Sequence, residues 1–171
     1  MQIVAHRGAS GSAPENTLAA LNLAWELGAD GVEIDIHLTA DGVPVCIHDP
    51  NLTRLAGVNA DVSALSLAEL QELDVGIWKG PEFIEEYVPT LEEALATVPE
   101  YKTLLIEVKD IPVKTLNAAL GPILERNKHF LATRQVYFMS FFPDLLWKLQ
   151  SAFPDLTLLL LADKLRRLPP N

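Results

Sequence analysis

Short apolar runs rich in β-branched residues alternate along the chain with longer stretches in which apolar positions recur at helical spacing. Most of the short runs are almost continuously hydrophobic, which predicts strands that are buried on both faces. Strands that alternate with helices are typical of βα units around a parallel sheet. The predicted strands are Ile3–His6, Gly31–His37, Val43–His48, Thr103–Lys109, Gln135–Phe141 and Leu156–Leu161, and the predicted helices are Thr17–Leu27, Leu67–Leu73, Leu91–Val98, Val113–Arg126 and Asp144–Ala152.

Two of the predicted helices begin with a capping box. Ser66 is followed three residues later by Glu69, and Thr90 by Glu93. In this motif the hydroxyl and the glutamate carboxylate each accept a hydrogen bond from a backbone N–H that the first turn leaves without a partner. Gly28 follows the first predicted helix and is a typical helix stop.

The regular pattern loosens between the third and fourth predicted strands. Residues 51–88 contain a turn-rich part, one short helix and a stretch that mixes Gly, Pro, aromatic and acidic residues. We interpret 51–88 as an insertion lying over one end of the sheet, within a single domain that spans 1–171. Six parallel strands do not close an eight-stranded barrel, and the chain ends in a predicted loop at 165–171. Because an open parallel sheet has two unpaired edges, we expect an incomplete barrel, or an oligomer or partner chain that covers the open edge.

The composition is that of an ordinary soluble globular protein. The chain has 171 residues, of which 49% are hydrophobic and 21% are charged, enough for one domain with a real core. The longest apolar stretch is too short to span a bilayer, so we expect no stable membrane insertion. No secretory signal is visible. The single cysteine, Cys46, has no partner within the chain, which favours a reducing compartment and the cytoplasm.

The net charge of −10 excludes one class of partner. Nucleic acid is bound mainly through clustered Lys and Arg, so we expect no nucleic-acid binding. The same charge repels an anionic substrate over long range. Chemistry on a phosphate would therefore need a local positive charge, and a bound cation is its natural source.

Titratable side chains gather at or near the carboxyl ends of four consecutive predicted strands. Residues two apart on a strand point to the same face, so Glu33 lies beside Asp35, and Glu107 beside Lys109. In a parallel α/β barrel the carboxyl ends of the strands form the end where active sites lie. The residues in question are His6 and Arg7 after the first strand, Glu33 and Asp35 in the second, His48 and Asp49 after the third, and Glu107 and Lys109 in the fourth.

Carboxylates inside apolar strands need a partner, because a buried unpaired charge costs several kcal/mol. Two explanations remain open for Glu33, Asp35 and Glu107: ion pairs with Arg7, Arg54 or Lys109, or a bound metal ion. Three carboxylates without sulfur or imidazole form an oxygen-only site, which suits Mg²⁺ or Ca²⁺ better than Zn²⁺.

The same residues indicate a reaction class. A cation can bind a non-bridging phosphate oxygen while His6 and His48 move protons. Arg7 and Lys109 can neutralise the remaining phosphate charge. The pattern therefore favours phosphoryl transfer or hydrolysis. His37 shares the face of Glu33 and Asp35, and we expect it to make a hydrogen bond to a loop.

An ordered series of motifs resembles the glycerophosphodiester phosphodiesterases. The series covers most of the chain up to about Phe141, and its order makes it far more specific than His-Arg-Gly alone. The motifs are His6-Arg7-Gly8, Pro14-Glu15-Asn16-Thr17, Gly28-Ala29-Asp30-Gly31-Val32-Glu33-Ile34-Asp35, Leu38-Thr39-Ala40-Asp41-Gly42-Val43-Pro44-Val45, His48-Asp49-Pro50-Asn51-Leu52-Thr53-Arg54, Pro89-Thr90-Leu91-Glu92-Glu93-Ala94-Leu95, Ile106-Glu107-Val108-Lys109 and Ser140-Phe141.

The resemblance implies a TIM (β/α)8-type barrel with a small insertion after the third strand, here C-terminally incomplete with about six parallel strands. It implies that His6 and His48 are the general acid/base pair, and that Arg7 and Lys109 contact the phosphate. The implied Mg²⁺ or Ca²⁺ ligands are Glu33, Asp35 and Glu107. The implied substrates are small phosphodiesters such as glycerophosphocholine and glycerophosphoethanolamine, cleaved to glycerol 3-phosphate and an alcohol.

Two alternatives to this enzyme remain. Members of the family continue through two further strands, the last with a Trp-Thr-x-Asn segment, and nothing similar follows Leu161. The chain is therefore also compatible with a truncated, non-catalytic binding or regulatory remnant of the fold. The other alternative is a phospholipase of the phosphatidylinositol or sphingomyelin type, which the acidic balance and the lack of a basic patch disfavour.

Overall fold

The computed structural model describes residues 1–162, except for the side chain of Phe130. The predicted loop at 165–171 lies outside the described residues. The strands are β1 (Val4–His6), β2 (Gly31–Leu38), β3 (Pro44–Cys46), β4 (Thr103–Val108), β5 (Gln135–Ser140) and β6 (Thr157–Leu160). The helices are α1 (Leu18–Glu26), α2 (Thr53–Ala56), α3 (Leu67–Gln71), α4 (Leu91–Thr97), α5 (Val113–Arg126), α6 (Lys128–Leu131) and α7 (Pro143–Ala152), with the 3-10 turns η1 (Val62–Ala64) and η2 (Pro81–Phe83).

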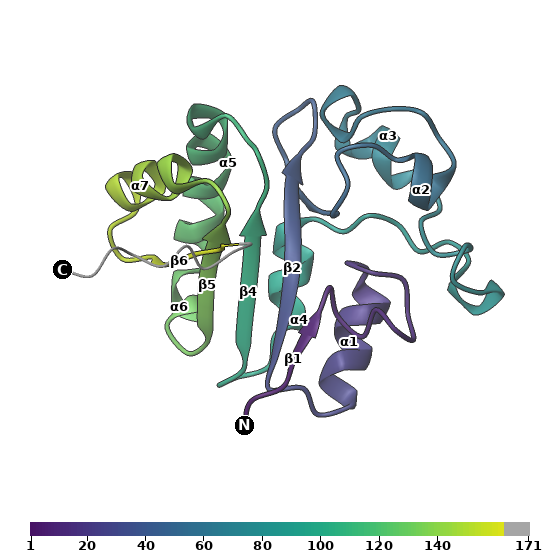
Figure 1. Cartoon of the computed structure of the whole chain (residues 1–171), viewed down its shortest axis with the longest axis horizontal. Helices are drawn as coiled ribbons and strands as arrows, with labels where there is room; N and C mark the ends of the chain where they lie inside the picture. Colours follow the sequence, from purple (N-terminus) through teal and green to yellow (C-terminus); the bar gives the residue numbers. More distant parts are fainter. Residues whose placement is uncertain (163–171) are drawn as a thin grey trace.

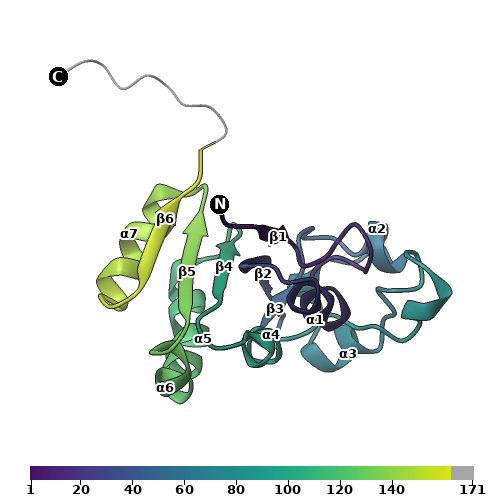
Figure 2. The same ribbon diagram turned by 90° about the horizontal axis from the view of Figure 1, so that it is seen from below.

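A single sheet runs through the centre of the molecule in the order β1-β2-β4-β5-β6 (Figure 1). Every neighbouring pair along this path is parallel. The sheet curves, and α1, α4, α5 and α7 follow its outer side (Figure 2). Within residues 1–162 it does not close on itself, as the count of predicted strands indicated.

The third strand runs opposite to the prediction. β3 pairs antiparallel with β2, with Ile36 opposite Cys46 and Leu38 opposite Pro44. The reason is the short connection between the two strands, because a parallel neighbour needs a crossover of about a dozen residues or more. The turn contains Gly42 at φ 79, a conformation that favours glycine, and it is closed by a hydrogen bond from the Thr39 N–H to the Val43 carbonyl. The sequence Asp41-Gly42 between two apolar runs is a hairpin signal that our prediction overlooked.

The main hydrophobic core lies between the sheet and the helices. Val32, Ile34 and Ile36 of β2 belong to it and are fully buried. Each such side chain stabilises the fold by roughly 1.5–3 kcal/mol relative to an exposed position. Because neighbours along a strand point to opposite faces, the intervening residues of β2 face away from the helices. That second face carries the polar groups.

The segment 51–88 packs around a smaller hydrophobic cluster of its own. Its members are Val45, Ile47, Leu52, Leu55, Val62, Leu70, Val75 and Val88. Two of them, Val45 and Ile47, come from β3 and the residue just after it, so the segment is fastened to the end of the hairpin. Figure 1 shows α2 and α3 beside the carboxyl end of β2.

The predicted helix starts are confirmed. Both capping boxes are present, with Ser66 and Glu69 at the start of α3 and Thr90 and Glu93 at the start of α4. The helix α5 has the bounds predicted from its pattern. The short elements α2, η1, η2 and α6 were not predicted, because a stretch of three or four residues is too short to show helical periodicity. No described helix is both long and apolar enough to cross a membrane.

Candidate active site

Three carboxylates converge on the face of the sheet that is opposite the helices. Asp35 of β2 pairs in register with Glu107 of β4, and Glu33 lies two residues before Asp35 on the same face. One oxygen from each of the three residues lies within 4.8 Å of the others. The exposed fractions are 5% for Glu33, 0% for Asp35 and 9% for Glu107. The convergence predicted from the strand pattern is therefore present.

The surroundings of Glu33 oppose its negative charge. Burial first, and then the charges of Asp35 and Glu107, raise the pKa of Glu33 to about 8. Its Oε2 accepts a hydrogen bond of 3.0 Å from the Arg7 N–H. Its Oε1 is buried without a hydrogen-bond partner among the described residues. A divalent cation would satisfy this oxygen and offset the repulsion, and oxygen-only ligands suit Mg²⁺ or Ca²⁺, so these residues fit such an ion.

Two cationic side chains lie against the same carboxylates. Lys109 Nζ is 2.6 Å from Asp35 Oδ1 and 2.5 Å from Glu107 Oε1. Arg7 Nε is 3.2 Å from Asp35 Oδ2. Ion pairing, the alternative to a metal site that the sequence left open, is thus present for Asp35 and Glu107. Because Glu33 has neither cation as a partner, ion pairing does not account for the whole cluster.

The two histidines lie at the rim of the carboxylate cluster. The side chain of His6 is 68% exposed and its Nε2 is 3.8 Å from Glu33 Oε2. The side chain of His48 is half-buried, and its Nδ1 is 2.7 Å from Asp49 Oδ1. A carboxylate can only accept a hydrogen bond, so Nδ1 of His48 carries the hydrogen. The other ring nitrogen of His48, Nε2, takes no part in the contact with Asp49.

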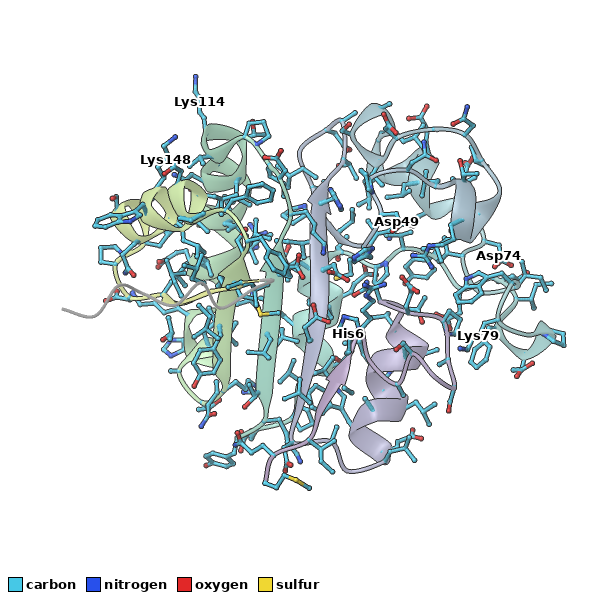
Figure 3. The ribbon with its side chains drawn as sticks, in the orientation of Figure 1. His6, Asp49, Asp74, Lys79, Lys114 and Lys148 are labelled. Carbon is cyan, nitrogen blue, oxygen red and sulfur yellow. The ribbon has the colours of Figure 1, made fainter. Side chains whose placement is uncertain are left out.

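Both histidines reach the rim because β1 and β3 share one edge of β2. β1 runs parallel to β2 and ends with His6 opposite Glu33. β3 runs the other way along the same edge and ends with Cys46 opposite Ile36. The two strands therefore end facing each other, and His6 and the residues after Cys46 meet near the middle of β2. Figure 3 shows His6 and Asp49 on the same side of β2.

Asn16 is a site residue for which the sequence analysis assigned no role. Its Nδ2 donates to Asp35 Oδ2 at 2.9 Å, and its Oδ1 accepts from the Asp35 N–H at 3.1 Å. Asn16 is 1% exposed and has a φ of 59, which asparagine tolerates better than most residues. The sequence did contain a sign of this role, because Asn16 belongs to the Pro-Glu-Asn-Thr motif.

A chain of ion pairs connects the loop after β1 with the start of the segment 51–88. Arg54 pairs with Asp49 and with Glu15, and Glu15 also pairs with Arg7. Arg54 was one of three possible ion-pair partners for the buried carboxylates, and that possibility is wrong because Arg54 pairs with Glu15 and Asp49 instead. Arg54 lies in α2, beyond the rim, where Glu15 and Asp49 are the acidic groups within its reach.

A hollow of about 670 Å³ opens beside the site at the carboxyl end of the sheet. Its lining includes His37, His48, Lys109 and Phe142. His37 Nε2 is 3.1 Å from the carbonyl oxygen of His48, the contact to a loop that its position predicted. The site is therefore open on one side to a space large enough for a small molecule.

Comparison with known proteins gives this arrangement a family. The model of the glycerophosphoryl diester phosphodiesterase family matches residues 6–169. The chain belongs to this family. A glycerophosphodiester phosphodiesterase of Caldanaerobacter subterraneus is 44% identical over 108 residues, which cover 63% of this chain and 44% of that protein. The human glycerophosphodiester phosphodiesterase 1 is 33% identical over 159 residues, which cover 89% and 46%.

Solved structures agree with the family and with its barrel. A phosphodiesterase from Oleispira antarctica, determined in complex with the product sn-glycerol-3-phosphate, superposes with a TM-score of 0.86 at 37% identity, covering 94% of this chain and 65% of that one. The glycerophosphodiester phosphodiesterase of Thermotoga maritima gives a TM-score of 0.73 at 33% identity and covers 96% and 63%. The sheet and its helices are thus part of a TIM-type barrel. The chain spans a little under half the length of these curated relatives.

Proposed function

We propose that this member of the glycerophosphoryl diester phosphodiesterase family hydrolyses glycerophosphodiesters such as glycerophosphocholine and glycerophosphoethanolamine to glycerol 3-phosphate and an alcohol. The observation that carries the proposal is the convergence of three buried carboxylates, two cationic side chains and His6 on one face of the sheet, beside a hollow that His48 and Lys109 line. The Oleispira relative, which was determined with sn-glycerol-3-phosphate, supports a small phosphodiester as substrate. The family match favours this function over the lipid-cleaving alternative.

The proposed roles follow from the contacts of each side chain. His6 is exposed beside Glu33 and acts as the base that takes a proton from the attacking water molecule. His48 has its Nδ1 held by Asp49 and acts through Nε2 as the acid that gives a proton to the departing alcohol. Arg7 and Lys109 hold the charged phosphate oxygens. The P–O bond to the alcohol breaks as the new P–O bond forms.

The proposed cofactor is a divalent cation, Mg²⁺ or Ca²⁺, with Glu33, Asp35 and Glu107 as its ligands. Such an ion, when bound, supplies positive charge to a non-bridging phosphate oxygen. Asn16 holds Asp35 by two hydrogen bonds and keeps that carboxylate directed at the cluster. Outer contacts of this kind orient ligands in metal sites.

We also propose a domain organisation and a location. Residues 1–171 form a single barrel domain that is incomplete, and 51–88 form the insertion within it. The separate hydrophobic cluster of the insertion supports this division. The cytoplasm is the proposed compartment, supported by the single cysteine, Cys46, which is buried.

The test is hydrolysis of glycerophosphocholine by this chain, measured beside a version extended by the last two βα units of the Oleispira relative. Each protein is assayed with Mg²⁺, with Ca²⁺ and after treatment with a chelator. We expect turnover that depends on the cation and is highest in the extended version. Turnover that survives the chelator would contradict the role of the metal.

The histidine roles are tested by His6→Ala and His48→Ala. Loss of a general acid or base lowers kcat on the order of 100- to 10,000-fold. Both side chains lie at the rim, so we expect circular dichroism spectra and unfolding temperatures like those of the parent. If the given chain and the extended chain both bind metal but hydrolyse no diester, the non-catalytic alternative is favoured instead.

A further inference from the structure

Glu15 lies between two guanidinium groups and uses both of its oxygens. Oε1 accepts from Arg7 Nη1 at 3.0 Å and from Arg54 Nη2 at 2.7 Å. Oε2 accepts from Arg54 Nη1 at 3.0 Å. The side chain of Glu15 is only 11% exposed, unlike that of Arg54 at 44%. Glu15 and Arg54 form a bidentate pair, and Arg7 adds a further hydrogen bond to the same carboxylate. This geometry holds the three side chains in fixed positions.

Each arginine continues to a different part of the proposed site. Arg7 reaches Asp35 Oδ2 through its Nε at 3.2 Å. Arg54 reaches Asp49 Oδ2 through its Nε at 2.6 Å, and Asp49 Oδ1 is 2.7 Å from His48 Nδ1. One uninterrupted series of contacts therefore joins the carboxylate cluster to the imidazole of His48, with Glu15 at its middle.

Arg7 and Arg54 belong to two parts of the chain that are not paired with each other as strands. Arg7 lies in the loop after β1 at a φ of 58, a conformation rarely adopted by arginine. Arg54 lies in α2, a helix of the segment 51–88. Burial opposes the ionisation of Glu15, yet hydrogen bonds and charge from Arg54 and Arg7 hold its pKa below the usual value. The carboxylate is therefore a persistent negative link between the loop and the helix.

We propose that Glu15 is a positioning residue for the reaction. It orients Arg7 directly, and it orients the imidazole of His48 through Arg54 and Asp49. A single carboxylate thereby couples the placement of the phosphate-binding guanidinium to that of the proton donor. The inference rests on the proposed roles of Arg7 and His48, but its structural part, the fixed orientation of His48, can be measured without turnover.

The experiment replaces the charge of Glu15 and keeps its shape. Glu15→Gln retains the side-chain length but leaves two arginines competing for one neutral amide oxygen. The matched control is Glu92→Gln, which weakens another bidentate pair. There Arg126 Nε is 3.1 Å from Glu92 Oε1, and Arg126 Nη2 is 2.8 Å from Glu92 Oε2. Glu92 and Arg126 lie at the start of α4 and the end of α5, and no hydrogen bond or ion pair among the described residues joins them to the site.

Two readouts are taken on each variant. The first is kcat and KM for glycerophosphocholine in the form that shows turnover. The second is the pair of imidazole nitrogen NMR resonances of His48, assigned by their loss in His48→Gln. These resonances report which ring nitrogen carries the hydrogen. Added loss of stability alone would leave them unchanged in the folded protein.

We expect Glu15→Gln to lower kcat by roughly 10- to 100-fold, the loss that follows from a small displacement of reacting groups. We also expect its His48 resonances to move toward the average of the two tautomers. Glu92→Gln should match the parent in both readouts. Parent-like resonances in Glu15→Gln overturn the inference, whether or not the enzyme turns over. Displaced resonances in a protein without turnover would instead support the positioning and contradict the proposed function.

Discussion

Glu33 and Asp35 are two residues apart on the same strand, but their surroundings differ. The Asp35 carboxylate accepts a hydrogen bond from Asn16 Nδ2, the Asp35 N–H donates one to Asn16 Oδ1, and the carboxylate lies within ion-pair distance of Arg7 and Lys109. Glu33 has one hydrogen bond from the protein, to Oε2, and a buried Oε1 with no partner among residues 1–162. Each oxygen of Asp35 thus has a cationic side chain within 3.2 Å, whereas Glu33 Oε1 has no such neighbour among the described residues and needs either a proton or a cation.

This difference predicts an unusual response to Glu33→Gln. Glutamine keeps an oxygen for the Arg7 N–H and cannot ionise, whereas the raised pKa of Glu33 means that folding works against its ionisation at neutral pH, so the metal-free protein should gain about 1–4 kcal/mol of stability there. The same change removes a ligand, so the stabilisation by added Mg²⁺ or Ca²⁺ should shrink. Thermal unfolding with a chelator and with each cation measures both effects. Asp110→Asn, which alters an exposed neighbouring carboxylate, is the control. A variant with a parent-like response to the cation would exclude Glu33 as a ligand.

A second residue-level prediction concerns Asp49 and acid. Hydrogen bonds from Arg54 first, and also from His48, lower the pKa of Asp49 from 3.8 to about 2 in the folded protein. A depressed carboxylate pKa stabilises the fold at pH values above 3.8, and the contribution disappears as the pH falls toward 2. In Asp49→Asn this part of the acid dependence should be absent. This is checked by urea unfolding of both proteins between roughly pH 5 and pH 2, a range that includes both pKa values of Asp49. Parallel stability curves would contradict the pairing.

The hairpin of β2 and β3 determines where the second histidine lies. The sequence predicted that His48 ends a parallel strand. His48 does lie near the other polar groups, but it does so because β3 is antiparallel to β2. β3 returns along β2 and ends beside its middle, facing the end of β1. Apolar patterning indicates that a run of residues is a strand but carries no information on its direction. Direction follows from the length and turn chemistry of the connection.

The connection from β1 to α1 depends on Gly8. Gly8 has a φ of 75, and a Cβ at this position would lie 2.6 Å from the backbone carbon of Ala20. Gly8→Ala should therefore lower the free energy of unfolding by about 1–3 kcal/mol. The change should also displace Arg7, the preceding residue. Gly11→Ala is the matched control, because a Cβ there meets nothing within 4 Å. Denaturant unfolding of the two variants should separate them, and equal stabilities would contradict the close approach.

The open sheet leaves part of its inner face uncovered over residues 1–162. The rows that carry Glu33 and Asp35 continue across the sheet to β6, where Leu159 is 40% exposed. In the structural relatives the chain matches about two thirds of a longer protein, 65% in the Oleispira phosphodiesterase. The carboxylate cluster forms on β2 and β4, which have neighbours on both sides. The proposed metal-binding part of the site therefore lies in the most fully paired part of the sheet.

The overall charge leads to a prediction about salt. A net charge of −10 repels anions over distances that salt screens. Raising the ionic strength from roughly 10 to 150 mM shortens the screening length from about 30 to about 8 Å. The kcat/KM for an anionic diester such as glycerophosphoglycerol should therefore rise more with salt than that for zwitterionic glycerophosphocholine. Initial rates at a fixed concentration of cation test this. An equal response of the two diesters would show that long-range repulsion is unimportant.

The sequence by itself determined the strands, the longer helices and the position of the polar face. Alternation of apolar runs located all six described strands and the long helices, the capping boxes located two helix starts, and carboxylates inside apolar strands marked the polar face. These features depend on local periodicity and on the cost of burying a charge, which one chain segment can reveal. The tertiary structure alone decided the reversal of β3, the hydrogen bonds of Asn16 and the link through Glu15. Those features depend on which segments become neighbours in space, and side chains such as Glu15 and Arg54 meet only after folding has brought their loops together.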